Sequence, residues 1–263
     1  MRDRAGRPPL PNFVIVGAMR SGSTSLYKYL QVHPQVWMPR KEIHFFDRRW
    51  DNGLDWYRHR FDGWSGEPAV GEATPTYLAE TAALDRMAAT IPDARLVAIL
   101  RDPVDRAYSH YWMEHVRGRD DRPFADAAPE YLARGRYLPQ LEAASARFGR
   151  DSIAVVLLDD LQASPGDTYA EVCAFLGVDP AFRPPRLGER VNRFVSFRSM
   201  WLRNARRRLP KAFRIGRIVG KLNAVEGGYP PLDAALAARL RADMAADNAA
   251  LAAWLGRDLS AWD

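Results

Sequence analysis

Short apolar runs alternate along the chain with segments of helical periodicity. Residues 12–16, 95–100 and 153–158 are almost entirely apolar. Runs of this length, without polar alternation, are typical of strands that are buried on both faces of a sheet. Helical patterns follow each of them, which is the order of a parallel sheet. The pattern therefore predicts a three-layer α/β fold with a central, mostly parallel sheet flanked by helices.

Helices and their ends follow from the same pattern. We expect helices over 23–32, 54–61, 82–90, 103–116, 124–134, 138–148 and 167–176, and a short strand over 69–72. Asp102 is the expected N-cap of one helix, with Pro103 in its first position, and Gly177 is the expected C-cap of another. Apolar residues recur every fourth position between Leu232 and Met244, which predicts an amphipathic closing helix.

Two segments are expected to lack regular structure. Residues 36–38 lie between Pro34 and Pro39 and read as a short apolar link, and residues 41–47 read as a charged loop. The chain shows no internal repeat and no linker. We therefore expect one domain over residues 12–263, preceded by a flexible N-terminus over residues 1–11.

Composition is that of an ordinary globular protein. The chain has 263 residues, of which 47% are hydrophobic and 27% charged, enough for one α/β domain with a buried sheet. Cys173 is the only cysteine, which excludes an intrachain disulfide and favours a reducing, cytoplasmic location. We find no signal-peptide pattern, and no apolar run approaches the roughly 20 residues of a membrane span.

The first candidate site follows the first apolar run. Residues 17–24 read Gly-Ala-Met-Arg-Ser-Gly-Ser-Thr and lead into a helical pattern. A glycine-bounded loop before a helix offers backbone N–H groups and the positive helix end to an anion. The G-x-x-x-x-G spacing matches a P-loop, but Ser23 stands where an ATP-binding loop has lysine. The sequence predicts a P-loop-like phosphate site that is not an ordinary ATP or GTP site.

A second anion site is predicted around Arg101. This residue follows the apolar run 95–100, and ligands of open α/β sheets bind at the carboxyl ends of strands. Ser109 lies about two turns into the following helix, and an Arg and a hydroxyl can bind one phosphate together. The alternative is that Arg101 pairs with Asp102 or Asp105 and that Ser109 is incidental. A neighbouring phosphate loop favours the first interpretation.

Positive charge is concentrated late in the chain. The net charge is +6, and no Asp or Glu occurs from Arg190 to Val225, where Arg and Lys are frequent. Such a block suits an anionic partner, namely a multiply phosphorylated nucleotide, an acidic substrate, a membrane surface or nucleic acid. A solvated helix face is an equally acceptable interpretation.

Together the two anion motifs resemble those of the sulfotransferases that use 3′-phosphoadenosine 5′-phosphosulfate. The likeness covers most of residues 10–180, and residues 41–47 and 71–77 are similar to the Golgi-type branch that acts on heparan-like sugars. The resemblance implies that Arg101 and Ser109 bind the 3′-phosphate, and that Arg198, in a looser motif, closes over it. The residues implied to bind the 5′-phosphosulfate are Arg20, Ser21, Gly22, Ser23, Thr24 and Ser25.

The resemblance also implies catalytic roles. Sulfuryl transfer is an in-line displacement at sulfur, so a base should activate the acceptor and fixed donors should stabilise the leaving oxygen. Glu42 matches the base of the sugar-acting branch, although a salt bridge with Lys41 or Arg40 would also explain it. His44 is the rival base. Arg20 stands where the family often has lysine, and it should stabilise charge because it cannot release its proton.

The sequence thus predicts a metal-independent sulfotransferase that acts on a hydroxyl or amine of a small molecule or glycan. Ala73 stands where heparan-type members often have lysine, which weakens a prediction of a heparan-like acceptor. A P-loop kinase is one alternative, but the loop lysine and an evident magnesium-binding Asp are lacking. A nucleic-acid-binding protein is another, through residues 190–225, where few aromatic residues are interleaved. We expect no nucleic-acid partner, and the sequence does not indicate the oligomeric state.

Overall fold

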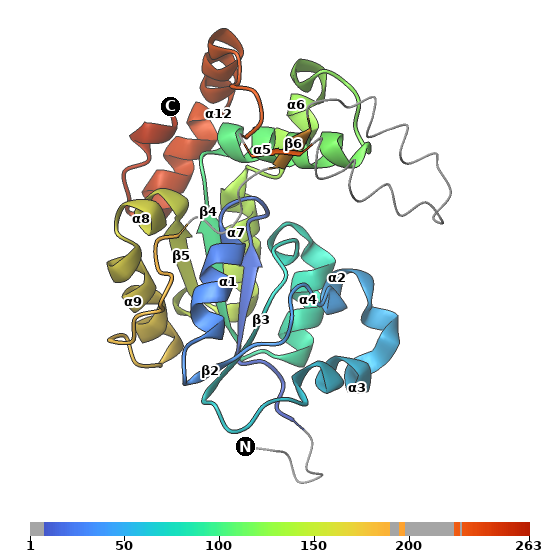
Figure 1. The fold of residues 1–263 in the computed structure, drawn as a ribbon, viewed down its shortest axis with the longest axis vertical. Helices are drawn as coiled ribbons and strands as arrows, with labels where there is room; N and C mark the ends of the chain where they lie inside the picture. Colours follow the sequence, from blue (N-terminus) through green and yellow to red (C-terminus); the bar gives the residue numbers. More distant parts are fainter. Residues whose placement is uncertain (1–7, 190–194, 198–223, 227) are drawn as a thin grey trace.

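The computed structural model describes residues 8–189, 195–197, 224–226 and 228–263 (Figure 1). Its core is a five-stranded sheet in the order β2-β3-β1-β4-β5, in which every neighbouring pair is parallel. Its strands are β1 (Phe13–Gly17), β2 (Val36–Trp37), β3 (Ala69–Ala73), β4 (Arg95–Leu100) and β5 (Ile153–Leu157). A separate antiparallel pair consists of β6 (Val195–Phe197) and β7 (Ala224–Glu226). The α/β fold with a parallel sheet is confirmed.

Helices account for most of the remaining described chain. They are α1 (Ser23–Gln31), α2 (Phe45–Arg48), α3 (Gly53–Arg58), α4 (Thr81–Thr90), α5 (Pro103–Arg117), α6 (Phe124–Ala133), α7 (Tyr137–Phe148), α8 (Leu158–Ala163), α9 (Pro165–Leu176) and α12 (Ala234–Leu255). Short 3-10 helices span Trp50–Asn52, His59–Phe61, Tyr77–Ala79, Arg150–Ser152 and Ser260–Trp262. Within the described ranges, no helix is both long and apolar enough to cross a bilayer.

Alternating side chains of the sheet separate two hydrophobic cores. In β1, Phe13 and Ile15 pack into one cluster with side chains of α1 and α9. Val14 and Val16 point the other way, into a cluster with side chains of α4 and α7. A third cluster joins α5, α6 and α12, which lie together in Figure 1. Successive strand residues face opposite sides of the sheet. Because these strands are apolar at every position, both faces of the sheet must be covered, and helices cover them.

Helix ends follow the capping prediction. The Asp102 side chain accepts hydrogen bonds from the N–H groups of Val104 and Asp105, at 2.7 Å and 3.0 Å. Gly177 ends α9 in the left-handed region, with φ 74°. The predicted closing helix is α12, which buries an apolar stripe that includes Leu240 and Met244. These local signals were sufficient because a cap depends on residues within one turn.

Three elements differ from the expectation. The predicted link 36–38 contains β2, which pairs with Ala69 and Val70 of β3, and two residues are too few for a periodic signal. The predicted loop 41–47 ends in α2, whose Phe45 and Phe46 are buried. Helix α8 begins at Leu158, directly after β5, where the apolar run conceals the change from strand to helix.

The strand order creates the place for a ligand. β1 lies between β3 and β4, so the carboxyl ends of all three strands are adjacent. The chain passes from β1 through α1 to β2 and β3 on one side of β1, and then through α4 to β4 on its other side. Open α/β sheets bind ligands at such a switch point. Arg198 and most of the basic block 190–225 lie outside the described residues.

Candidate active site

The loop between β1 and α1 has the conformation of an anion-binding turn. Gly22 precedes α1 with φ 99°, a left-handed conformation that favours glycine. A Cβ on Gly22 would come within 2.7 Å of Leu158 Cδ1. Arg20 has φ 73°, and Arg20 and His44 are the non-glycine residues with positive φ among those described. The N–H groups of Ser25 and Leu26 donate to the Gly22 carbonyl, so at the start of α1 it is the N–H groups of Ser23 and Thr24 that lack an acceptor within the helix and are available to an anion.

Arg20 connects this loop to the second predicted anion site. Its Nε donates to Ser109 Oγ of α5 at 3.0 Å, although the two residues are 89 positions apart. Burial lowers the pKa of Arg20, and the nearby positive charge of Arg101 lowers it further, against an upward contribution from Tyr229. Two guanidinium groups that converge in a partly buried place attract an anion.

Arg101 begins the connection from β4 to α5 and is mostly buried. Its Nη2 donates to Asp105 Oδ2 at 3.1 Å, with 21% of the Arg101 side chain exposed. The pairing with Asp105 that the sequence left open is therefore present. Arg101 nevertheless lines the same cavity as Arg20 and Ser109, so the two interpretations of this residue are compatible.

One cavity brings the predicted residues together. Its volume is about 1300 Å³, and it extends from the loop after β1 across α5. The predicted residues that line it are Arg20, Gly22, Ser23, Thr24, Ser25, Glu42, His44, Arg101 and Ser109. Ser21 is fully buried and does not line this cavity. Arg198 lies outside the described residues.

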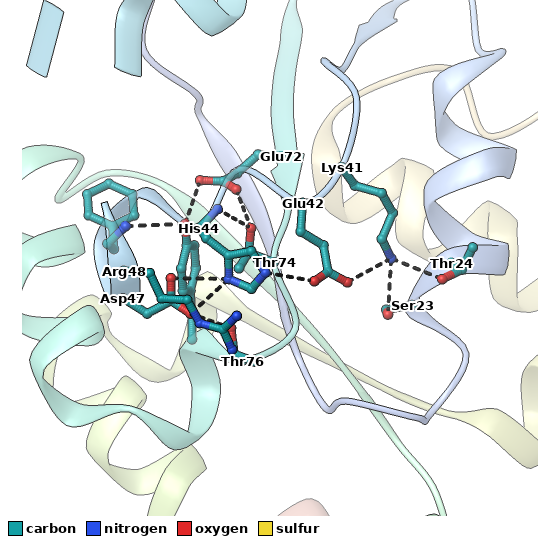
Figure 2. Close-up of polar contacts among 12 residues, drawn as sticks. Ser23, Thr24, Lys41, Glu42, His44, Asp47, Arg48, Glu72, Thr74 and Thr76 are labelled. Carbon is teal, nitrogen blue, oxygen red and sulfur yellow. Dashed lines mark hydrogen bonds and ion pairs between the residues drawn. The ribbon is translucent and has the colours of Figure 1, made fainter. Parts of the chain in front are cut away.

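A chain of charged groups that includes Glu42, His44 and Asp47 lines the same cavity (Figure 2). His44 Nε2 lies 3.0 Å from Glu42 Oε2, and His44 Nδ1 lies 2.9 Å from Asp47 Oδ2. Thr76 Oγ1 donates to Asp47 Oδ2 at 2.7 Å. The imidazole therefore lies between two carboxylates, and both of its nitrogens have a carboxylate partner.

This arrangement determines the protonation of His44. Hydrogen bonds to Asp47 and Glu42 raise the pKa of His44 to about 9, so the ring is an imidazolium at neutral pH. Burial raises the pKa of Glu42, but the hydrogen bond from His44 and the charge of Lys41 outweigh it, and the net shift is downward. Glu42 is thus an ionised carboxylate, 33% exposed, and can accept a proton. An imidazolium cannot.

Known proteins resemble this chain both in sequence and in fold. The sequence model of the sulfotransferase family matches residues 60–183. A solved sulfotransferase from Alicyclobacillus acidocaldarius is 29% identical with a TM-score of 0.73, over 97% of this chain and 99% of its own. This chain belongs to the sulfotransferase family. The structural match extends over almost the whole chain, whereas the family model begins after the loop at 17–25 and after Glu42.

Curated relatives match over part of their length. Heparan sulfate glucosamine 3-O-sulfotransferase 3B1 of Mus musculus is 30% identical over 66% of this chain and 48% of its own. Membrane-associated sulfotransferase kil1 of Dictyostelium discoideum is 41% identical over 39% of this chain and 22% of its own. The matched part is thus less than half the length of either relative.

Lys41 is a further site residue, expected from the sequence only as an ion-pair partner of Glu42. Its Nζ donates to Thr24 Oγ1 at 3.1 Å and to Ser23 Oγ at 3.5 Å (Figure 2). The same ammonium lies 3.9 Å from Glu42 Oε1. The loop after β1 thus contains no lysine, but the ammonium of Lys41, from the segment that carries Glu42, lies beside it. The adjacent Lys-Glu pair was the available signal, but only the fold shows which loop it reaches.

A buried carboxyl group is linked to this charged chain through Thr74 (Figure 2). Glu72 of β3 is fully buried, and its oxygens accept hydrogen bonds from Tyr57 Oη and Thr74 Oγ1, each at 2.7 Å. Burial raises the pKa of Glu72 to about 7. Thr74 Oγ1 also accepts the backbone N–H of His44 at 3.4 Å. Glu72 thus fixes the hydroxyl that holds the start of α2.

Arginine and glutamate alternate on the remaining wall of the cavity. Arg134 Nη2 lies 3.3 Å from Glu80 Oε1, and Glu114 pairs with Arg117 and Arg119 at 2.9 Å and 3.2 Å. All five line the cavity. This wall is polar and charged, so it suits a hydrophilic molecule rather than an apolar one. No sequence pattern predicted that Glu114 of α5, or Arg134 directly after α6, would contribute to this wall.

Proposed function

We propose that this protein transfers the sulfuryl group of 3′-phosphoadenosine 5′-phosphosulfate to a hydroxyl or amine of a small-molecule or glycan acceptor. Adenosine 3′,5′-bisphosphate is the other product. One observation carries the proposal: Arg20 and Arg101, from two different strand ends, converge with Ser109 on a single cavity that also holds Glu42. A doubly phosphorylated nucleotide needs two separate anion sites, and this pair supplies them.

In the proposed binding mode, the loop after β1 holds the 5′-phosphosulfate. The N–H groups at the start of α1 and the hydroxyls of Ser23 and Thr24 face this group, and Ser25 lines the same cavity. Lys41 and Arg20 add positive charge beside it. Arg101 and Ser109 hold the 3′-phosphate through charge-assisted hydrogen bonds. Ser21 is assigned a structural part under this loop, because its side chain is fully buried.

The chemical step is an in-line displacement. The acceptor oxygen or nitrogen forms a bond to sulfur while the bond between sulfur and the phosphate oxygen breaks, and the acceptor proton passes to Glu42. Negative charge grows on the departing phosphate oxygen, where Arg20, Lys41 and the loop N–H groups stabilise it. We assign the base to Glu42 rather than to His44, because His44 already carries a proton and orients the Glu42 carboxylate.

The charged wall of the cavity indicates the class of the acceptor. Its alternating arginine and glutamate side chains favour a hydroxylated molecule that both donates and accepts hydrogen bonds, and a sugar has this character. The heparan sulfate enzymes among the relatives support the same class. We keep the cytoplasmic location as part of the proposal, to be tested by fractionation of the producing cell.

The direct test is transfer of a radiolabelled sulfuryl group. Purified protein and labelled donor are incubated with separate alcohols, phenols, amines and sugars, and labelled products are separated. We expect label on at least one acceptor and equal formation of adenosine 3′,5′-bisphosphate. Phosphoryl transfer from ATP to the same panel, without sulfuryl transfer, would instead support the kinase alternative.

A further inference from the structure

A network of four charged groups lies behind the predicted 3′-phosphate site. Arg101 Nη2 contacts Asp105 Oδ2 at 3.1 Å, and Asp105 Oδ1 lies 3.4 Å from Arg241 Nη2. Arg241 Nε donates to Asp102 Oδ2 at 3.0 Å. Arg241 belongs to α12, so a helix near the end of the chain reaches the beginning of α5.

Asp105 is the obstacle to phosphate binding by Arg101. The carboxylate occupies one edge of the Arg101 guanidinium. A phosphate monoester carries about −1.5 to −2 charge at neutral pH, so a phosphate on Arg101 would lie close to a like charge. The Asp105 side chain is 47% exposed, so water screens part of its charge, but a carboxylate that has lost its ion-pair partner still repels a phosphate beside it. A second cation beside Asp105 would offset this repulsion and make it easier for Arg101 to turn to a phosphate.

Arg241 is placed to be that cation. Its guanidinium faces both Asp102 and Asp105, and 29% of its side chain is exposed. Asp102 is itself buried and committed to the cap of α5 through its other oxygen. The Arg241 fork can therefore hold Asp102 with one nitrogen and shift towards Asp105 with another.

We propose that Arg241 is a positioning residue for the donor: it neutralises Asp105 and thereby releases Arg101 for the 3′-phosphate. This inference rests on the proposed function, in which the donor carries a 3′-phosphate. A residue of α12 would thus contribute to the selectivity for a donor with a 3′-phosphate. A purely structural tie between α12 and α5 makes a different prediction, because Arg241 pairs with Asp105 in that tie, so loss of the Asp105 charge would weaken the tie further and would not restore bisphosphate binding.

The test compares two ligands across a double-mutant cycle. Adenosine 3′,5′-bisphosphate and adenosine 5′-phosphosulfate, which lacks the 3′-phosphate, are titrated calorimetrically into the wild type, Arg241→Gln, Asp105→Asn and the double variant. We expect Arg241→Gln to weaken the bisphosphate by roughly 10-fold and the phosphosulfate by less than about 2-fold. Asp105→Asn should bring the double variant back to within about 3-fold of the wild type.

Controls separate this inference from the proposed function. Arg239→Gln, on the exposed side of the same helix, removes an equal charge and should leave both affinities unchanged. Thermal unfolding shows whether Arg241→Gln folds. If it does not, Arg241→Lys and Asp105→Asn are used in its place. Asp105→Asn alone should strengthen bisphosphate binding. Equal losses for both ligands, or no rescue by Asp105→Asn, would overturn the role of Arg241. A wild type that binds no bisphosphate would overturn the proposed function itself.

Discussion

At the scale of single residues, the site depends on one imidazolium between two carboxylates. His44 contacts Glu42 and Asp47 at 3.0 Å and 2.9 Å, and these contacts raise its pKa to about 9. The ring therefore holds Glu42 ionised and oriented. This is why the proposed base is Glu42, although a histidine with an ordinary pKa would be the better base near neutral pH.

Replacement of Glu42 should separate chemistry from donor binding. We expect Glu42→Gln to lower the turnover number by roughly 100-fold or more, because the acceptor loses its base. The affinity for adenosine 3′,5′-bisphosphate should change little. Glu67→Gln is the matched control, since Glu67 is a partly exposed carboxylate that accepts hydrogen bonds from the nearby Ser65 and does not line the cavity. Near-normal turnover of Glu42→Gln would remove Glu42 from the mechanism.

The charge on His44 predicts a pH-dependent stability. Because folding raises its pKa from 6.5 to about 9, its stabilising contribution is complete below pH 6.5 and is lost as the pH rises through about 9. The difference in unfolding free energy between the wild type and His44→Asn should shrink over that range in urea titrations. His59→Asn is the control, because His59 pairs with Asp62 at the surface, 72% exposed. A difference that does not vary with pH would contradict a charged His44.

At the scale of elements, the loop after β1 is shaped by one glycine and one neighbouring helix. Gly22 has a positive φ, and Leu158 of α8 lies against the place where its Cβ would be. The close approach brings the start of α1 to the edge of the cavity that α8 helps to line. Loop conformation and donor binding should therefore be linked at this residue.

Gly22→Ala should reduce both stability and donor binding. The positive φ alone costs a side chain on the order of 1–3 kcal/mol, and contact with Leu158 forces the loop to move. Gly53→Ala provides the comparison, because Gly53 has φ 81° with nothing within 4 Å of its Cβ position. We expect both variants to unfold at lower temperature, but only Gly22→Ala to weaken the bisphosphate. Equal binding by the two variants would show that the loop tolerates the change.

Elements with strong local signals were predictable from the sequence. The apolar runs gave β1, β4 and β5, and Asp102-Pro103 gave the start of α5, because both signals depend on neighbouring residues. Strand β2 was missed because two residues acquire their structure only by pairing with β3. The approach of Lys41 to Thr24 was missed for a related reason, since no local pattern indicates which loop a side chain reaches.

At the scale of the whole molecule, the sheet order brings distant segments to one cavity. β1 lies between β3 and β4, so Arg20, Glu42 and Arg101 meet although the sequence separates them widely. Most of the residues proposed to bind the donor were predictable from the sequence, because they lie in two contiguous motifs. The contributions of Arg134, α6 and Arg241 could not be seen, because they depend on how helices pack across the carboxyl edge of the sheet.

The central claim is that two strand ends bind opposite ends of one 3′-phosphorylated nucleotide. Calorimetric titration of the wild type and Arg101→Ala with adenosine 3′,5′-bisphosphate and with ATP tests it most directly. We predict that the wild type binds the bisphosphate roughly 100-fold more tightly than ATP, and that Arg101→Ala removes most of this preference. Equal or tighter binding of ATP by the wild type, or a preference that survives the loss of Arg101, would contradict the account.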